Sequence, residues 1–310
     1  MKIAIIGAGW LGCHLALKLR QNHQIRLYES ESVFSQTSYR NQNRLHLGFH
    51  YARNSYTREM CRDTFNRFLD DYSFLTSEIK NNIYAVPTQH SLIDFNTYIK
   101  IFDDYDYEII NLKMDNIEGA IRVGERYIDP FKAKRFFESE LQDVIKYAKI
   151  EKSDFGFLSS EFNLVINCTN NQFHRIEENC YEENCEVLLY EKVNNLNFDA
   201  LTMVDGNLYS IFPYQDSTFT VTDVEVTPDS SLSTEEKKEK IEEKIAENYS
   251  SFSKDFVYKK SFFSKKVKPT TDSPDRMPKF RYNENILDCF TGKIQGIYNV
   301  EEYVRDICES

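Results

Sequence analysis

The opening residues alternate between apolar runs and a glycine-rich turn. Residues 2–6 form an apolar, β-branched run, which is typical of a strand buried on both faces of a parallel sheet. Leu15, Ala16 and Leu19 follow at helical spacing, and residues 25–28 predict a second short strand. The pattern therefore predicts the order strand, glycine turn, helix and strand within the first thirty residues.

The turn between that strand and helix has the composition of a dinucleotide-binding loop. Its residues are Gly7, Ala8, Gly9, Trp10, Leu11 and Gly12. The first glycine permits a tight turn, the second lets the backbone approach a pyrophosphate, and the third lets the helix pack on the strand. The helix N-terminus offers N–H groups and a positive dipole end to the phosphates. Glu29 ends the second strand, where a carboxylate accepts hydrogen bonds from a ribose diol.

The type of dinucleotide is only partly decided by these residues. An acidic residue at position 29 argues against a 2′-phosphate, so the adenosine belongs to FAD or NAD rather than NADP. A glycine-rich turn without any ligand is the remaining alternative.

The rest of the pattern predicts further helices and strands. Helices are expected over 58–79, 131–147 and 234–249 and in a last segment that runs to Ile307, and strands over 164–167, 187–193, 208–214, 219–226 and 286–290. The helix over 234–249 begins at Ser233 or Thr234 and mixes Glu with Lys. It is therefore expected to be a solvated surface helix with i,i+4 ion pairs.

Composition excludes several classes of protein. The 310 residues can bury a core without disulfides or metal, and 41% of them are apolar. The net charge of −11 argues against nucleic acid as a partner. Seven scattered cysteines indicate reduced thiols rather than a disulfide framework or a zinc site. No apolar run of 18 residues predicts a membrane span, and glycines and charges interrupt the signal-like N-terminus, so a cytoplasmic protein is expected.

A polar segment over residues 35–51 is a second candidate cofactor contact. It combines amide, guanidinium, imidazole and phenol groups, which suit a polar heteroaromatic ring. The segment resembles the second cofactor segment of the D-amino-acid oxidase and glycine oxidase superfamily of FAD-dependent oxidoreductases. Gln36-Thr37 and His46-x-Gly48-x-x-Tyr51 are similar to the 2-hydroxyglutarate oxidase branch in particular.

This resemblance implies roles for individual residues of the segment. Thr37 and Ser38 would contact the phosphate or ribose. The flavin would be lined by Asn43, Arg44, Leu45 and His46. Relatives often have glycine where Asn43 stands, and asparagine is the next residue type most tolerant of a positive φ. Taken singly, His46 and His50 are somewhat better explained as structural imidazoles than as catalytic residues.

Two later segments resemble the same superfamily. The strand over 164–167 with Cys168, Thr169 and Asn170 is similar to an element whose strand end approaches FAD, and Asn170 again replaces a usual glycine. The C-terminal run Pro274-Asp275-Arg276-Met277-Pro278 precedes a strand and the turn Thr291-Gly292-Lys293-Ile294. In relatives this turn points a helix N-terminus at the flavin. The dipole and Lys293 would stabilise negative charge on the reduced ring.

Substrate contacts also follow from the resemblance. Arg276 is the first candidate to bind a substrate carboxylate in a bidentate manner, and Arg44 competes for this role. Tyr214 lies on a predicted strand whose inward side chains face the substrate in relatives. Together with His46, these residues are the candidates for catalysis.

The resemblance implies an α/β fold, with a Rossmann-like FAD-binding domain of the glutathione-reductase type and a mixed or antiparallel β-sheet substrate domain. The first would comprise residues 1–57, 126–174 and 268–310, and the second residues 58–125 and 175–267. The expected enzyme oxidises a C–N or C–OH bond of an amino acid, amine or 2-hydroxy acid by hydride transfer to flavin N5, and oxygen or another acceptor reoxidises the flavin.

Three alternatives remain open at this point. The first is an NAD-dependent dehydrogenase, supported by the first thirty residues. The second is a non-catalytic binding module with a flavoprotein fold. The third is the same flavin chemistry on a sugar-type substrate.

Overall fold

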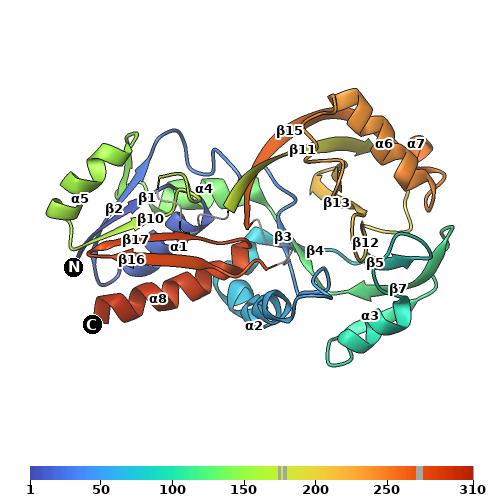
Figure 1. The fold of residues 1–310 in the computed structure, drawn as a ribbon, viewed down its shortest axis with the longest axis horizontal. Coiled ribbons are helices and arrows are strands. Elements are labelled where there is room, and N and C mark those ends of the chain that lie inside the picture. The colour runs from blue at the N-terminus through green and yellow to red at the C-terminus, as the bar shows by residue number, and fades with distance from the viewer. Residues whose placement is uncertain (174–175, 177–179, 270–274, 310) are drawn as a thin grey trace.

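Three β-sheets organise the chain. The computed structural model describes residues 1–173, 176, 180–269 and 275–309. Figure 1 shows two parts, one built on a six-stranded sheet and the other on an eight-stranded sheet. A small sheet of β3 (Arg44–Leu45), β8 (Arg126–Ile128) and β4 (Thr76–Glu78) is the third. Both chain ends lie beside the six-stranded sheet.

The six-stranded sheet joins the first strand of the chain to the last. Its order is β16 (Lys279–Asn283), β17 (Ile286–Phe290), β10 (Leu164–Asn167), β1 (Lys2–Ile6), β2 (Gln24–Glu29) and β9 (Ile145–Tyr147). All neighbours are parallel except β16, which is antiparallel to β17. The strand predicted over 2–6 is buried as expected, because helices cover this sheet.

The helices beside this sheet are α1 (Trp10–Leu19), α4 (Pro130–Glu140), α5 (Phe155–Glu161) and α8 (Ile297–Glu309). The short 3₁₀ turns are η1 (Ser73–Leu75), η2 (Lys152–Asp154) and η3 (Ile294–Gly296). Helix α4 begins where expected, because Asp129 accepts hydrogen bonds from two backbone N–H groups and Pro130 occupies the first turn. Its predicted end at residue 147 is wrong. The helix stops at Glu140, and Ile145–Tyr147 instead adds β9 to the open edge of β2.

The eight-stranded sheet has the order β15 (Phe256–Pro269), β11 (Cys180–Lys192), β14 (Thr218–Asp223), β13 (Tyr209–Gln215), β12 (Ala200–Met203), β5 (Asn82–Pro87), β7 (Ile117–Val123) and β6 (Tyr107–Ile110). Helices α6 (Thr234–Ala246) and α7 (Phe252–Asp255) pack on one face, and α3 (Phe95–Ile101) packs on the other face near β5 and β7. The strands predicted over 187–193, 208–214 and 219–226 correspond to β11, β13 and β14. The predicted mixture of parallel and antiparallel strands is confirmed.

Helix α6 is more deeply buried than the sequence predicted. Ser233 forms the predicted capping box with Glu236. Lys237, however, is 3% exposed and its Nζ lies 3.3 Å from Oε2 of the equally buried Glu186 on β11. The interpretation as a fully solvated helix is therefore wrong, because one turn of α6 faces a buried carboxylate.

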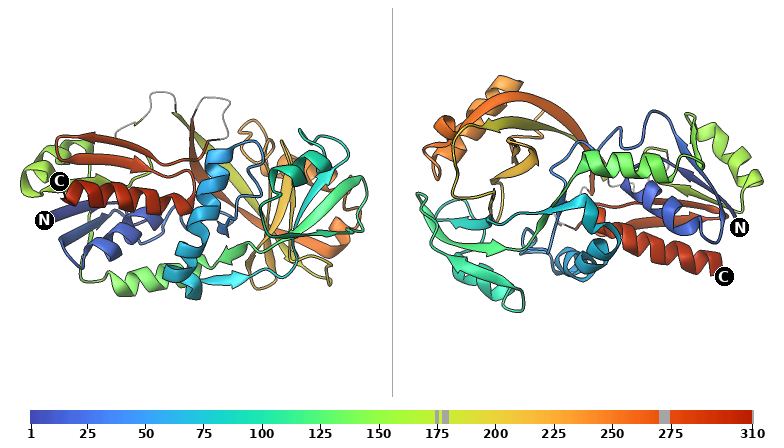
Figure 2. Two further views of the ribbon diagram at one scale, coloured as in Figure 1. Left: turned by 90° about the horizontal axis from the view of Figure 1, so that it is seen from below. Right: turned by 180° about the vertical axis from the view of Figure 1, so that it is seen from behind.

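Helix α2 (Ser55–Tyr72) lies at the junction of the two parts in the views of Figure 2. Its side chains Phe65, Phe68 and Tyr72 belong to the core around the six-stranded sheet. The predicted domain limits stay a prediction, and this packing argues for moving the first boundary from residue 57 to the end of α2. Among the described residues, no helix has both the length and the apolar composition that crossing a bilayer requires.

Candidate active site

The glycine turn has the geometry that a dinucleotide loop needs. Gly7 has a φ of +100°, and a Cβ at this position would lie 3.0 Å from the carbonyl oxygen of Cys168. A Cβ at Gly12 would lie only 1.9 Å from the carbonyl oxygen of Gly7. Glycine at residue 12 therefore lets α1 approach β1, as the sequence predicted.

The N-terminus of α1 is open to a ligand. Gly9 caps the helix and has no side chain to bond the first N–H groups. Ser38 lies directly beside it, since the Trp10 N–H donates to Ser38 Oγ over 2.9 Å. Ser38 thus stands where the phosphates are expected. Thr37 instead donates its hydroxyl to the Lys265 carbonyl over 2.6 Å, which ties this segment to β15.

Glu29 sits at the end of β2 as predicted, and it is buried. Its Oε2 accepts the Ala8 N–H over 2.7 Å, and its Oε1 accepts the Glu31 N–H over 3.0 Å. A carboxylate oxygen can accept more than one hydrogen bond, so Glu29 can still bind a ribose diol. We call Gly7–Gly12, Glu29 and Ser38 the nucleotide cradle.

The two asparagines at usual glycine positions keep the backbone that glycine would have. Asn43 has a φ of +50° and Asn170 a φ of +58°. Asparagine adopts this left-handed region more readily than other side chains do. Asn43 also donates its side-chain N–H to the Asn41 carbonyl over 3.0 Å. The two departures from the family pattern therefore leave the local backbone intact.

Thr169 and its neighbours lie at the end of β10, next to the cradle. The Thr169 hydroxyl donates to Asn167 Oδ1 over 2.7 Å, and Cys168 Sγ lies 3.9 Å from Cys289 Sγ on β17. In β3, Leu45 is fully buried and pairs with Arg126.

Arg44 is a buried cation with unused hydrogen-bond donors. Its Nη1 donates to Thr202 Oγ1 over 2.7 Å, and its guanidinium lies 4.2 Å from the centre of the Phe212 ring. Nε and Nη2 have no hydrogen-bond partner among the residues that the structure describes. Burial lowers the pKa of Arg44, whereas Tyr84 and Glu125 raise it. An arginine stays protonated under such conditions, so a charged edge is left for a ligand.

His46 and Lys293 meet beside Arg44, although they are 247 positions apart. Lys293 Nζ lies 3.4 Å from His46 Nε2 and 4.9 Å from the centre of the Tyr51 ring. Burial and then Lys293 lower the pKa of His46 to about 4. Burial and then Arg44 lower the pKa of Lys293 to about 7. At neutral pH the imidazole is therefore uncharged, and the amine can hold or release a proton.

Glu125 is a functional candidate that the sequence did not reveal. It is 1% exposed, in the turn between β7 and β8. Its Oε1 accepts the Leu47 N–H over 2.8 Å and its Oε2 accepts the Tyr84 hydroxyl over 2.7 Å. Burial opposes its ionisation, but His46, Tyr84 and the Leu47 N–H together lower the pKa of Glu125. We call Arg44, His46, Glu125 and Lys293 the junction cluster.

Gln295 is a second residue that the sequence did not reveal. It lies in η3, just after the Gly292 turn, and is fully buried. Its Nε2 donates to the His46 carbonyl over 2.8 Å, and its Oε1 accepts the His46 N–H over 3.1 Å. The amide therefore fixes the cofactor segment against the last turn, next to Ile294 at the start of η3.

The other two catalytic candidates lie outside the junction cluster. Arg276 packs closely against the Gly292 turn, since a Cβ at Gly292 would lie 2.9 Å from the Cα of Arg276. Nη1 of Arg276 donates to the Asp275 carbonyl over 2.7 Å. Tyr214 packs against the rings of Phe131 and Phe262, and burial raises its pKa to about 12. Pro274, the first residue of the C-terminal motif, lies outside the described residues.

These elements define a two-part oxidoreductase fold whose parallel sheet carries a dinucleotide loop. A family model described as FAD dependent oxidoreductase, DAO, matches residues 2–91. The FAD-dependent monooxygenase FPY4 of Fusarium mangiferae is 31% identical over 337 residues, covering 99% of this chain and 91% of the relative. The chain belongs to the DAO family of FAD-dependent oxidoreductases, and FAD is its cofactor.

Two further comparisons agree with this family. The FAD-dependent monooxygenase kojA of Aspergillus flavus is 39% identical over 194 residues, covering 54% of this chain and 45% of the relative. The crystal structure of glycine oxidase from Geobacillus kaustophilus superposes with a TM-score of 0.76 at 12% identity, covering 99% of this chain and 94% of the other. The predicted α/β fold and the predicted enzyme class are confirmed. An NAD-dependent dehydrogenase and a non-catalytic module are not favoured.

The residues present fit a bound FAD. Gly9, the N-cap residue of α1, provides no side-chain cap, and Glu29 keeps acceptor capacity beside it. The junction cluster adds buried donors that have no partner among the described residues and are costly unless a ligand satisfies them.

Proposed function

We propose that this enzyme oxidises a C–N or C–OH bond of a small acid, namely an amino acid or a 2-hydroxy acid. The observation that carries the proposal is the edge of Arg44 formed by Nε and Nη2, which is buried and has no partner among the described residues. These two N–H groups point in parallel and match the two oxygens of a carboxylate. A carboxylate would remove the penalty of burying them unpaired.

Arg44 is a better candidate for this carboxylate than Arg276, which the sequence placed first. Both arginines already donate Nη1 within the protein, but Arg44 is buried with its other edge unpaired among the described residues, whereas Arg276 is only half-buried. Arg44 also stacks on Phe212, which holds the guanidinium plane in one orientation. We therefore propose Arg44 as the anchor of the substrate and Arg276 as a residue at the edge of the site.

The cofactor would be held by the cradle, by the segment Asn43–His46, by Cys168–Asn170 and by Gly292–Ile294. When bound, FAD would supply the acceptor that takes a hydride at N5. Lys293 Nζ would hold the proton that the substrate hydroxyl or ammonium group gives up. Oxygen or another electron acceptor stays the proposed second substrate.

The relatives suggest a second candidate reaction. FPY4 and kojA are named monooxygenases, and such a reaction inserts one oxygen atom of O₂ and needs an external electron donor. A sugar-type substrate is a third possibility, since an arginine also binds hydroxyl groups.

One experiment separates these reactions. The purified flavoprotein is mixed without oxygen with amino acids, 2-hydroxy acids, their amides and sugars, and the visible absorbance of the flavin is followed. We expect loss of absorbance with a free acid and none with its amide. Reduction by NADH or NADPH alone, followed by incorporation of ¹⁸O from ¹⁸O₂ into an added acid, would instead support the monooxygenase.

A further inference from the structure

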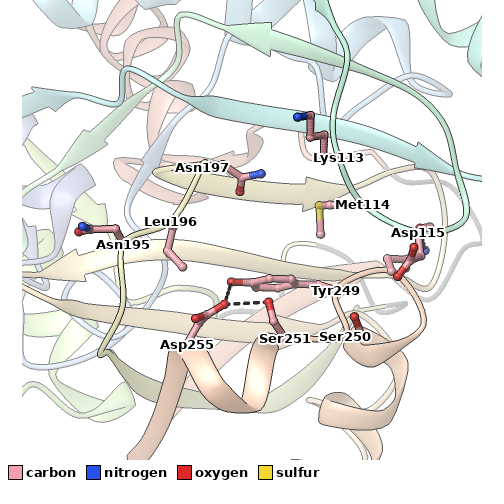
Figure 3. Close-up of a pocket in the computed structure, with 11 residues that line it drawn as sticks. Lys113, Met114, Asp115, Asn195, Leu196, Asn197, Tyr249, Ser250, Ser251 and Asp255 are labelled. Atoms are coloured by element: carbon pink, nitrogen blue, oxygen red, sulfur yellow. Dashed lines mark hydrogen bonds between the residues drawn. The ribbon is translucent and has the colours of Figure 1, made fainter.

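A polar pocket away from the junction cluster does not point to a ligand. Figure 3 shows this cavity of about 590 Å³ between α7 and the loops near Met114 and Leu196. The Tyr249 and Ser251 hydroxyls both donate to Asp255 Oδ2, over 2.6 and 2.8 Å. These three polar groups are therefore already paired with one another, and the junction cluster carries the stronger observations.

Glu125 is the one member of that cluster with no function so far. Its two oxygens hold the backbone of the cofactor segment at Leu47 and the hydroxyl of Tyr84. Oε1 also lies 3.6 Å from Nδ1 of His46. This distance is too long for a hydrogen bond but short enough for the carboxylate charge to act strongly on the dipole of the neutral ring in a buried site.

The two sides of the His46 ring both select the same tautomer. On one side the Glu125 carboxylate is negative and only accepts hydrogen bonds, so it attracts a proton on Nδ1 and repels a lone pair there. On the other side a protonated Lys293 Nζ, 3.4 Å away, can only donate, so Nε2 must then offer its lone pair. Nδ1 has no hydrogen-bond partner among the described residues, so the charge of Glu125 decides its protonation.

We propose that Glu125 is a positioning residue that keeps the proton of His46 on Nδ1, so that Nε2 accepts a hydrogen bond from Lys293. In the chain Tyr84, Glu125, His46, Lys293, the donors on both sides of Glu125 then point toward its carboxylate. The importance of this chain for catalysis rests on the function proposed above. The tautomer itself is a property of the folded chain.

The direction matters for what Lys293 can do. When neutral Lys293 gives one N–H to His46, its lone pair is left for the substrate. The O–H or N–H bond of the substrate then breaks and its electron pair forms the C=O or C=N bond, while a new N–H bond forms at Nζ. The hydrogen of the C–H bond leaves with its electron pair as hydride, which bound FAD would accept. With Nε2 of His46 protonated instead, Lys293 would turn its lone pair toward the ring and lose this capacity.

Several groups face this chain and will influence its titration. They are Glu125 from the turn between β7 and β8, Tyr84 from the eight-stranded sheet, Arg44, His50 and Tyr51 from the cofactor segment, and Lys293 from the last turn. Arg44 and Lys293 both lower the pKa of His46, and Glu125 raises it. Removing the charge of Glu125 therefore lowers the pKa of His46 further and weakens the preference for a proton on Nδ1.

The test uses the FAD-loaded protein labelled with ¹⁵N in its histidines, with His46 assigned from the H46N variant. The NMR shifts of Nδ1 and Nε2 report the tautomer without any turnover. We expect the Nδ1–H form in the wild type and a ratio of the two tautomers at least ten-fold lower in E125Q, because one full charge beside the ring is lost. Y84F is the matched control. It removes the hydroxyl that donates to Oε2 of Glu125 but keeps the carboxylate, so it should leave the tautomer of His46 unchanged.

Two outcomes would overturn the proposal. One is an unchanged tautomer in E125Q that still binds FAD, which would leave Lys293 alone in control. The other is an equal change in Y84F, which would indicate general loosening. A changed tautomer in E125Q supports the proposal whatever the substrate screen yields, so it is judged separately from the proposed function. Flavin reduction should then fall about ten-fold in E125Q as well, at unchanged half-saturation for the acid.

Discussion

The nucleotide cradle and the junction cluster are built in different ways. The cradle lies within the first 38 residues and works through backbone geometry, with three glycines and one carboxylate at fixed distances along the chain. The junction cluster is made of side chains from residues 44, 46, 125 and 293, which only the complete fold brings together. The comparison shows that a local motif indicates a dinucleotide, whereas long-range packing assembles the side chains of the junction cluster.

The largest effect is expected from Gly12→Ala in the cradle. The new Cβ would stand 1.9 Å from the carbonyl oxygen of Gly7, so α1 and β1 must separate. We expect a loss of about 3 kcal/mol or more in the free energy of unfolding, and protein purified without FAD. Urea denaturation and the flavin content of the purified protein measure both effects.

Gly9→Ala is the matched control for that change. Its Cβ would meet only the Ser38 hydroxyl, at 2.8 Å, which can move away. Stability should stay within about 1 kcal/mol, while FAD binds at least ten-fold more weakly because the helix N-terminus is obstructed. Equal stability loss in both variants would show that the cradle is not built by the close approach at residue 12.

A change to Arg44 tests the junction cluster. Arg44→Met removes the unpaired Nε and Nη2 edge, and the concentration of acid needed for half-reduction of the flavin should rise about 100-fold. Arg44→Lys keeps the charge without the two parallel donors and should recover only a small part of this loss. If Arg276→Met has the larger effect, the carboxylate binds at Arg276 and our ranking of the two arginines is wrong.

The pH dependence of flavin reduction tests Lys293. Burial places its pKa near 7, so the amine carries a proton below that pH and is neutral above it. A step that needs the neutral amine should become faster as the pH rises, by about ten-fold per unit below pH 7, and level off above it. Anaerobic stopped-flow measurements should show this limb in the wild type and lose it in Lys293→Met.

Glu301 in α8 tests the packing behind the cradle. It is 1% exposed and binds His14 of α1 at 3.1 Å and Arg67 of α2 at 2.8 Å. Burial opposes its ionisation, but His14, Arg67 and Arg305 lower its pKa to about 2. A carboxyl whose pKa falls on folding stabilises the protein above the ordinary glutamate pKa, and this stability disappears as the pH drops toward 2. Glu301→Gln should cost about 2 kcal/mol at pH 7 and flatten the acid limb of unfolding.

The smallest effect is expected at the asparagines that replace glycine. Asn43→Gly and Asn170→Gly keep a residue that tolerates the observed positive φ, so stability should change by no more than about 1 kcal/mol. Asn43→Val should destabilise more, since a β-branched residue is strained there. Thermal unfolding of the three variants provides the comparison, and a large loss in Asn43→Gly would show that its side-chain bond to Asn41 is needed.

The sequence predicted the cradle because its information is local. The strand over 2–6, the turn, helix α1 and Glu29 follow from residue types at short spacing, and even the positive φ of Asn43 follows from its alignment with glycine. Glu125 and Gln295 gave no such signal. A glutamate after a glycine in a turn normally faces water, and only the folded chain surrounds it with Leu47, Tyr84 and His46.

Two errors have the same origin. The end of α4 was missed because the open edge of β2 competes with the helix for residues 145–147. The burial of Lys237 was missed because its partner Glu186 lies on a strand 51 positions earlier.

The strand order of the six-stranded sheet has a consequence for biosynthesis. Strand β10 lies between β1 and β17, which stand far apart in the sequence. A nascent chain can form the βαβ unit of β1, α1 and β2 early, but β10 gains its second parallel neighbour only after β17 has emerged from the ribosome. The sheet that carries the glycine turn is therefore completed long after that turn has been synthesised.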